Sequence, residues 1–312
     1  MSALDLAVVI VTWNVRDLIA DALRTLITDL AQSGLQYQVY VVDSGSSDGT
    51  AQHVAALFPQ VTLTASPENL GFGRANNLAM RQMGFENPAI PTERLPKAVY
   101  LLNPDTLTQR GASRALYDAL FSAADIGWVG ANLTYADGSF QHGAFHFPGL
   151  RQLYAEFFPL PARLYNSGFN GRYPLRRYAG EQPFTVDFTL GATMMLRREV
   201  ILQTGMFDEA FFVYCEEVDW GWRVQRAGWR ALCVPSAHVV HLGGQSTSQV
   251  SAKSVVYLWE SRLKLYAKHY PRWKLKIAHG LVRAGIRSKL RHVPANRPDL
   301  TAAYQHILAI TV

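Results

Sequence analysis

The sequence predicts an α/β protein with a mostly parallel central sheet, helices on both faces and a C-terminal helical extension. Two observations lead to this fold class. In the first half of the chain, short apolar runs rich in β-branched residues alternate with segments whose apolar residues recur at helical spacing. Beyond residue 250, apolar residues recur only at helical spacing, among many basic residues. Strands that alternate with helices pair in parallel, because each helix returns the chain to the same edge of the sheet.

The expected elements follow in order along the chain. Strands are expected at 7–12, 38–42, 61–65 and 98–102, with helices at 15–30, 50–58 and 73–83 between them. Residues 135–182 are rich in Gly, Pro, Arg and aromatic residues without clear periodicity, so a long irregular segment is expected there. Ordered structure resumes over 184–197, with a helix at 218–227, a short strand at 230–234, an amphipathic helix at 256–270 and a second basic stretch at 273–291.

Charge divides the chain at the point where the strands end. Residues 1–250 carry 18 Lys and Arg and 22 Asp and Glu, whereas residues 251–312 carry 12 and 2. We therefore predict a domain over 1–250 and a basic amphipathic helical extension over 251–312. A basic surface suits nucleic acid or an anionic membrane, but the extension contains no nucleic-acid motif, so nucleic acid is not an expected partner.

Cysteine usage and hydropathy predict a cytoplasmic protein. The two cysteines, Cys215 and Cys233, form no CxxC pair and no disulfide framework, which favours a reducing compartment. The apolar stretch at 6–12 is short and follows an acid instead of basic residues, so it reads as a strand and not as a signal peptide. The sequence contains no stretch of about 18 consecutive apolar residues, so no membrane-spanning helix is expected.

The apolar strand at 98–102 stops at Asn103-Pro104-Asp105. An ionised carboxylate avoids the core, so Asp105 is expected where the strand leaves it, at the edge where open α/β sheets bind ligands. Pro104 ends the strand by removing a backbone donor. The alternative is that Asp105 only opens a surface turn.

The second strand also ends in an acid, Asp43, followed by Ser44 and a Ser/Gly turn. A carboxylate there can accept hydrogen bonds from a base or ribose, although a helix-capping turn is an equal alternative. Residues 71–75 match a GxGxx pattern, but Asn76 replaces the third glycine and the first strand leads into no glycine, which argues against a dinucleotide-binding dehydrogenase. Arg74 is a candidate cation for a diphosphate, or a solvated helix residue.

Three acids within four residues, Glu216, Glu217 and Asp219, follow an aromatic run. Apolar neighbours raise the pKa of a carboxylate, which suits a general base. Downstream, His238 and His241 would lie on opposite faces of a strand, so at most one is expected to be a ligand. Together with Asp105, such a histidine would complete an oxygen and nitrogen site for Mg²⁺ or Mn²⁺.

Seven segments, in this order, resemble glycosyltransferase family 2, the inverting enzymes of the GT-A fold, and in particular its bacterial rhamnosyltransferase-like members. The resemblance covers residues 6–248. Its segments are VVIVTWN, VVDSGSSDGT, ENLGFGRANN, YLLNPDT, GATMMLRREV, GMFDEAFFVYCEEVDWGWR and HVVHLGG.

The resemblance implies a role for each matching residue. Asp105 would coordinate a divalent cation, Mg²⁺ or Mn²⁺, on the donor diphosphate, with help from His241 because Asn103 replaces the first acid of the family's DXD motif. Glu217 would be the catalytic base, with Glu216 as the alternative. The remaining matched or neighbouring residues are expected to contact the nucleotide sugar: Thr12, Asn14, Asp43, Ser44, Asn69, Gly71, Arg74, Asn77, Asn103 and Asp219.

The expected function is metal-dependent, inverting transfer of a sugar in cell-envelope polysaccharide synthesis. The resemblance favours dTDP-rhamnose as donor, then a UDP-sugar. The basic, aromatic extension favours a peripheral enzyme at the inner face of the cytoplasmic membrane, acting on a saccharide or polyprenyl-diphosphate-linked acceptor. The alternatives are a sugar-nucleotide-binding protein without activity, which the retained acids disfavour, and a nucleotidyltransferase, which would show a Gly-rich phosphate loop near the N-terminus.

Overall fold

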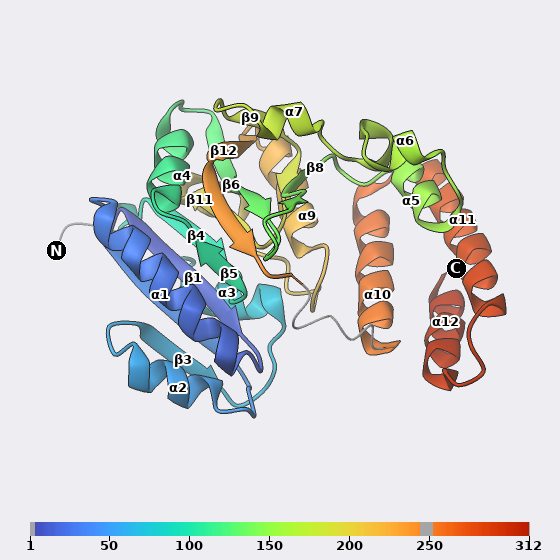
Figure 1. Ribbon diagram of the computed structural model, residues 1–312, viewed down its shortest axis with the longest axis horizontal. Helices are drawn as coiled ribbons and strands as arrows, with labels where there is room; N and C mark the ends of the chain where they lie inside the picture. Colours follow the sequence, from blue (N-terminus) through green and yellow to red (C-terminus); the bar gives the residue numbers. More distant parts are fainter. Residues whose placement is uncertain (1–3, 244–251, 312) are drawn as a thin grey trace.

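The computed structural model describes residues 4–243 and 252–311 and shows a mixed α/β domain followed by three helices (Figure 1). Its main sheet has the strand order β3-β2-β1-β4-β11-β6-β12-β5, with β7 and β9 paired at the side. Strands β1 to β4 are parallel, and β11 is inserted antiparallel between β4 and β6. The predicted fold class, a mostly parallel sheet with a helical extension, is confirmed.

The strands of the main sheet have the following bounds: β1 Leu6–Thr12, β2 Tyr37–Ser44, β3 Thr62–Ser66, β4 Ala98–Leu102, β5 Thr106–Thr108, β6 Ile126–Thr134, β7 Phe140–Gln141, β9 Phe184–Val186, β11 Thr193–Arg197 and β12 Arg230–His241. A separate pair is formed by β8 Ala144–Phe145 and β10 Phe188–Thr189. The helices of the α/β part are α1 Arg16–Gln32, α2 Thr50–Leu57, α3 Phe72–Gln82, α4 Ala112–Phe121, α8 Arg198–Thr204 and α9 Glu216–Arg226, with a 3₁₀ turn at Thr92–Arg94.

Two apolar cores cover the two faces of the sheet. On one face, Leu23 of α1 and Leu116 of α4 pack against alternate residues of β1 such as Val8. On the other face, Met80 of α3 and Trp220 of α9 pack against the intervening residues, such as Val9. This alternation explains why the central strands are apolar along their whole length.

The strand β12 is longer than predicted because it continues through a proline. Pairing with β6 shifts register between Val234 and His238, on either side of Pro235. A proline cannot donate to the ladder, so it is accommodated at such an irregularity. Beyond it, the strand continues to His241.

The segment 135–182, predicted to be irregular, contains short helices at α5 Leu150–Phe157, α6 Ala162–Tyr165 and α7 Leu175–Tyr178, and a 3₁₀ turn at Gly168–Asn170. These helices are only four to eight residues long, so each shows at most about two turns of helical period. Trp259 and Val282 form a third core with Leu153 of α5. The unit comprising α5 and the three C-terminal helices is called the helical unit below.

The C-terminal part of the helical unit consists of α10 Ala252–His269, α11 Arg272–Arg291 and α12 Pro298–Ile310. The helix α12 was not anticipated from the sequence. The predicted boundary between residues 250 and 251 and the last glycine of HVVHLGG, Gly244, lie outside the described residues. No helix in the described part of the chain is both long and apolar enough to cross a membrane.

Two glycines of α11 give a matched test of the contact between α5 and α11. A Cβ at Gly285 would lie 2.0 Å from Cγ of Phe157, whereas a Cβ at Gly280 would meet nothing within 4 Å. We expect Gly285→Ala to lower the free energy of unfolding by about 1–3 kcal/mol, because Phe157 must shift. Gly280→Ala should raise it by up to about 1 kcal/mol through helix propensity. Urea unfolding of both variants measures the difference, and equal values would contradict this packing.

Candidate active site

The carboxyl ends of β1, β2 and β4 meet at one edge of the sheet. Thr12 pairs with Asp43 in the register of β1 and β2, and Ile10 pairs with Leu102 in that of β1 and β4. The Thr12 hydroxyl donates a 2.9 Å hydrogen bond to Oδ1 of Asp43, and the Ser46 N–H donates to Oδ2 at 3.1 Å. Asp43 is therefore held with a fixed carboxylate orientation at this edge.

Asn14 fixes the turn after β2. Its side-chain oxygen accepts a 2.8 Å hydrogen bond from the Ser47 N–H, and its own N–H donates to Oγ of Ser46 at 2.8 Å. The φ of Asn14 is 51°, a left-handed conformation that asparagine tolerates better than most residues. Asn14 thus shapes the loop around Asp43.

Ser44, Asn69 and Gly71 join this edge to the start of α3. The Ser44 hydroxyl donates to Oδ1 of Asn69 at 3.3 Å and accepts from the Leu70 N–H at 2.7 Å. Oδ1 of Asn69 also accepts from the Gly71 N–H at 2.9 Å. Gly71 has a φ of 74°, and a Cβ there would lie 2.2 Å from the carbonyl oxygen of Phe212. Only glycine allows this approach.

Asp105 and His241 are brought together, as the sequence predicted. Nε2 of His241 lies 3.4 Å from Oδ1 of Asp105, and both side chains are about nine-tenths buried. Nδ1 of His241 lies 3.1 Å from the amide oxygen of Gln141. Because that oxygen can only accept, Nδ1 carries the proton, and a neutral ring then presents the Nε2 lone pair to a carboxylate. Two facing acceptors repel unless a cation or a proton lies between them.

The fit to a divalent cation can be judged from the donor atoms. A carboxylate oxygen and a neutral imidazole nitrogen, with Gln141 fixing the tautomer, form a donor set that suits Mg²⁺ or Mn²⁺. In the described part of the chain no three Asp, Glu, His or Cys side chains gather as a complete metal group. The pair alone therefore leaves coordination positions for phosphate oxygens, as is usual for Mg²⁺.

A series of contacts, called the rim below, runs from Asn103 at the end of β4 through Phe72 at the start of α3 to Phe212. The Asn103 N–H donates to the carbonyl of Ala192 at 3.0 Å, and a Cβ on the preceding Gly191 would lie 3.9 Å from the Phe72 ring. The Phe72 N–H in turn donates to the carbonyl of Phe212 at 3.1 Å. Phe212 lies four residues before Glu216, so these contacts connect the chain segment that leads to Asp105 with the segment that leads to the acidic cluster.

Glu216 and Glu217 open helix α9. Burial, and next the charge of Glu217, raise the pKa of the Glu216 carboxyl well above its usual value. Burial also raises the pKa of Glu217, although the backbone N–H groups of Glu217 and Val218 partly offset it. Oε2 of Glu216 is buried with no hydrogen-bond partner among the described residues. Of the two, Glu217 is the more exposed. When only one of the two carboxyl groups is ionised, that group is therefore Glu217.

The backbone before this helix is strained. Tyr214 and Cys215 have φ values of 69° and 70°, and neither is a glycine. Such conformations are costly for residues with a Cβ and recur at functional sites, where surrounding contacts hold them.

Three residues predicted to contact the nucleotide sugar are engaged elsewhere. The amide of Asn77 is bonded to Phe207 and Glu209, so it fixes the turn after α8. The side chain of Asp219 has no exposed area and is bonded to Arg223, Lys268 and His269. The guanidinium of Arg74 is 55% exposed and 3.5 Å from Glu68. The side chains of Asn77 and Asp219 therefore already have protein partners, and the prediction that they contact the nucleotide sugar stays a prediction.

The two histidines at the end of β12 lie in different environments. His238 is exposed and His241 is buried, as the alternation along the strand predicted. Sequence reasoning missed Gln141 and His269, the residues that orient His241 and bind Asp219. No motif indicated them, since each is a single polar residue whose partner is distant along the chain.

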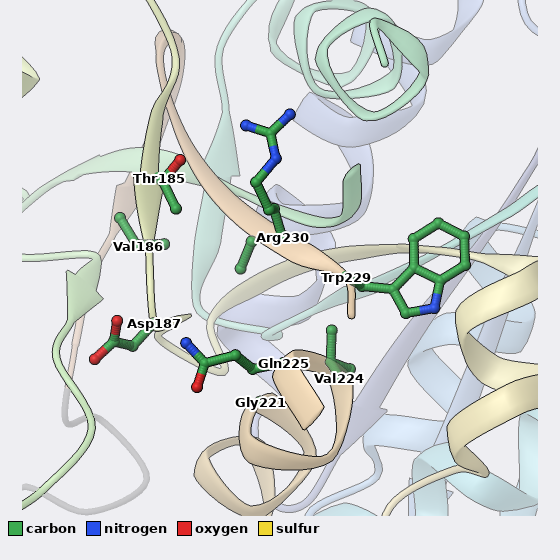
Figure 2. A pocket seen from close by; sticks show the side chains of 9 residues that line it. Thr185, Val186, Asp187, Gly221, Val224, Gln225, Trp229 and Arg230 are labelled. Carbon is green, nitrogen blue, oxygen red and sulfur yellow. The ribbon is translucent and has the colours of Figure 1, made fainter. Parts of the chain in front are cut away.

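A small cavity of about 70 Å³ lies elsewhere, between β9, α9 and the start of β12 (Figure 2). Arg230, which lines it, begins β12, whereas His241 ends that strand. The cavity is thus at the opposite end of the strand from the rim and contains none of the predicted site residues.

Comparisons with known proteins identify relatives. The family described as "Glycosyltransferase like family 2" matches residues 4–274. The N-acetylglucosaminyl-diphospho-decaprenol L-rhamnosyltransferase of Mycobacterium tuberculosis, found in two strains, is 31% identical over 238 residues, 75% of this chain and 76% of the relative. Rhamnosyltransferase WbbL of Escherichia coli K12 is 28% identical over 83 residues, 27% of this chain and 31% of WbbL.

Solved structures share the fold at low sequence identity. GalNAc-T7 with UDP, GalNAc and Mn²⁺ aligns with a TM-score of 0.59 and 13% identity over 98% of this chain, which spans 54% of GalNAc-T7. The mannosyltransferase PcManGT of Pyrobaculum calidifontis, with GDP-Man and Mn²⁺, gives 0.54 and 16% over 99% of this chain and 86% of that one. S. aureus TarS 1-349 gives 0.51 and 13% over 98% and 90%.

Proposed function

This chain belongs to glycosyltransferase family 2, and we propose that it is an inverting rhamnosyltransferase that uses a nucleotide sugar and a polyprenyl-diphosphate-linked saccharide. The observation that carries the proposal is the rim on which Asp105 and His241 are joined, through the start of α3, to the Glu216–Glu217 pair. The name of the Mycobacterium tuberculosis relative supports the choice of rhamnose and of a lipid-linked acceptor. The donor is dTDP-rhamnose, with UDP-sugars as the next candidates, and the product serves cell-envelope polysaccharide synthesis.

The donor edge would bind the nucleotide. Asp43, oriented by Thr12 and the Ser46 N–H, presents a carboxylate to the pyrimidine base. Ser44, Asn69 and Gly71 shape the wall between the base and the diphosphate. Asn14 and Asn103 border the same edge, and Arg74 is a solvated cation near it.

Asp105 and His241 would hold a divalent cation, Mg²⁺ or Mn²⁺, against the diphosphate. When bound, it offsets the negative charge that develops on the leaving nucleoside diphosphate. The hydrogen bond between Nδ1 of His241 and Gln141 would orient the ring so that Nε2 faces the cation. The two structural neighbours that carry Mn²⁺ support a divalent cation.

Glu217 would act as the base. The acceptor hydroxyl attacks the anomeric carbon of the donor sugar while its proton passes to the Glu217 carboxylate. The bond from that carbon to the phosphate oxygen breaks on the opposite face, so the configuration is inverted and the nucleoside diphosphate leaves. Burial raises the pKa of Glu217, which makes it a stronger base than an ordinary surface carboxylate.

An exposed face of α11 would dock on the inner surface of the cytoplasmic membrane. Trp273 is 63% exposed and Ile277 is 47% exposed, and they lie one turn apart. Exposed basic residues flank them: Arg272, Lys276, Arg283 and Arg287. This pairing of apolar and basic side chains suits an anionic interface. Trp259 of α10, by contrast, is buried in the core of the helical unit and does not belong to this face.

The assignment of the base is tested by two amide substitutions. We expect Glu217→Gln to lower kcat by about 10²–10⁴-fold, the usual contribution of a general base. Glu216→Gln should retain activity within about tenfold, because glutamine mimics the protonated carboxyl that burial favours at this position. Transfer is measured with a panel of nucleotide sugars, and donor binding by thermal stabilisation serves as the control. Reversal of the two results would make Glu216 the base, and full activity of both would favour another mechanism.

The pH dependence follows from the same pair. Glu217 must be ionised to accept a proton, so kcat/KM should fall as pH decreases through its pKa. Because burial raises that pKa, the acid limb is expected above the range of an ordinary carboxyl group. Glu216→Gln should leave the limb in place, since it replaces a neutral group. A pH–rate profile of both proteins measures this, and an acid limb near pH 4 would refute the raised pKa.

The metal site is tested without activity. Mn²⁺ and dTDP together should raise the melting temperature of the protein more than either alone, because phosphate oxygens complete the coordination. In Asp105→Asn and in His241→Phe the additional stabilisation by Mn²⁺ should be lost, while Asp118→Asn, at an exposed ion pair of α4, should retain it. Equal Mn²⁺ effects in all proteins would exclude this pair as the ligands.

Membrane docking is tested by flotation with vesicles of phosphatidylglycerol and phosphatidylcholine. Replacing Trp273 and Ile277 together by serine should reduce the bound fraction about tenfold or more, since apolar burial is lost. Leu202→Ser is the matched control, because Leu202 of α8 is as exposed as Ile277, at 47%. Binding that is unaffected by the double substitution, or that is equally strong to neutral vesicles, would argue against this surface.

A further inference from the structure

One side of α10 lies along the chain segment 208–219, which contains the proposed base. Five residues at three- and four-residue spacing form this side, called the α10 seam: Ser254, Tyr257, Ser261, Lys264 and Lys268. Such spacing places them in one row along a helix. The seam is part of the C-terminal extension, whereas the segment it contacts belongs to the α/β domain.

The seam binds the backbone just before the base. The Ser261 hydroxyl donates a 2.8 Å hydrogen bond to the carbonyl of Val213, and the Lys264 ammonium donates to the carbonyl of Ala210. These carbonyls belong to an irregular stretch between α8 and α9, in which the Phe212 carbonyl accepts from the Phe72 N–H of α3. The rings of Tyr257 and Phe212 lie 5.2 Å apart. The seam thus supplies partners to the stretch from 210 to 213.

The seam also forms ion pairs with Asp208 and with the first turn of α9. Nζ of Lys268 lies 2.7 Å from Oδ2 of Asp208 and 2.7 Å from Oδ1 of Asp219. Nε2 of His269, whose side chain is 1% exposed, lies 2.7 Å from the same Asp219 oxygen. Burial opposes ionisation of Asp219, but hydrogen bonds from His269 and Lys268, and the charge of Arg223, outweigh it and lower its pKa to about 2. Asp219 is therefore an anchored carboxylate two residues after Glu217.

The contacts on both sides enclose the strained pair Tyr214 and Cys215. A residue with a Cβ returns readily to ordinary φ values unless its neighbours prevent it. Ser261 holds the chain one residue before the pair, and Lys268 holds α9 four residues after it. Relaxation of the pair would rotate the start of α9 and with it Glu217.

We propose that the α10 seam positions the catalytic base, with Ser261 and Lys268 as positioning residues, so that the extension is part of the catalytic apparatus. The role given to Glu217 rests on the function proposed above. The contacts with segment 208–219 do not depend on it. A small error in the placement of a reacting group costs a large factor in rate, which makes kcat the sensitive quantity.

The test uses Ser261→Ala and Lys268→Met in the full chain. We expect each to lower kcat by roughly 10–100-fold while the donor KM and the thermal stabilisation by nucleotide stay within about twofold, because the donor edge is untouched. Hydrogen exchange of residues 210–217 should accelerate, and that of residues 98–106 should not. Lys268→Arg, which keeps the charge, should recover most of kcat.

Lys253→Met is the matched control, since Lys253 is exposed on the same helix and the seam does not include it. Unchanged exchange of 210–217 and unchanged kcat would overturn the proposal. A parallel loss of kcat and donor binding would also overturn it, because that is the result of general destabilisation. Should Lys268→Met not fold, Ser261→Ala carries the same test. If Glu217→Gln proves active, the exchange measurement still decides whether the seam holds the segment.

Discussion

The register of β1 with its two parallel neighbours is the constraint on which the site depends. Thr12 lies beside Asp43, and Leu102 ends its strand beside Ile10, so the polar residues that follow all emerge at one edge. A shift of one residue would turn these side chains to the other face. The apolar cores on both faces prevent that shift, since Val8 and Val9 are buried on opposite sides. The proposed donor edge is therefore specified by core packing.

In each of the two pairs, Asp105 with His241 and Glu216 with Glu217, groups that can accept a hydrogen bond or a proton lie close together. At Asp105 and His241 the imidazole tautomer set by Gln141 leaves two lone pairs facing at 3.4 Å, an arrangement that a cation satisfies. At Glu216 and Glu217 burial excludes solvent, so protonation of Glu216 reduces the charge of the pair. One pair is thereby suited to a diphosphate and the other to a hydroxyl proton.

Periodicity and chain order allowed the sheet and its central helices to be predicted, because these depend on local alternation. The choice of His241 as the partner of Asp105 came from the resemblance to the glycosyltransferase family, and the structure places the two side chains together. Other residues that support the site could not be predicted, because their partners are distant along the chain and adjacent only in the folded protein. Gln141 and His269 are isolated polar residues whose roles come from contacts 100 and 50 residues away. The helix α5 was missed because it has only 8 residues, about two turns, within a segment rich in Gly and Pro.

The position of Asp219 in the acidic cluster does not by itself define what its carboxylate does. It belongs to the same four-residue acidic cluster as Glu217, yet its side chain has no exposed area and its oxygens are bound by Arg223, Lys268 and His269. A buried carboxylate with cations from two helices is costly to separate, because each charge left behind would be unpaired. The helix that carries the proposed base is consequently fixed to the C-terminal helices, whose next member, α11, presents Trp273 and Ile277 outward. The change in composition at residue 250 thus marks a change in charge along the chain. The contacts that hold the proposed base extend across this position, because α10 binds Asp219 of α9.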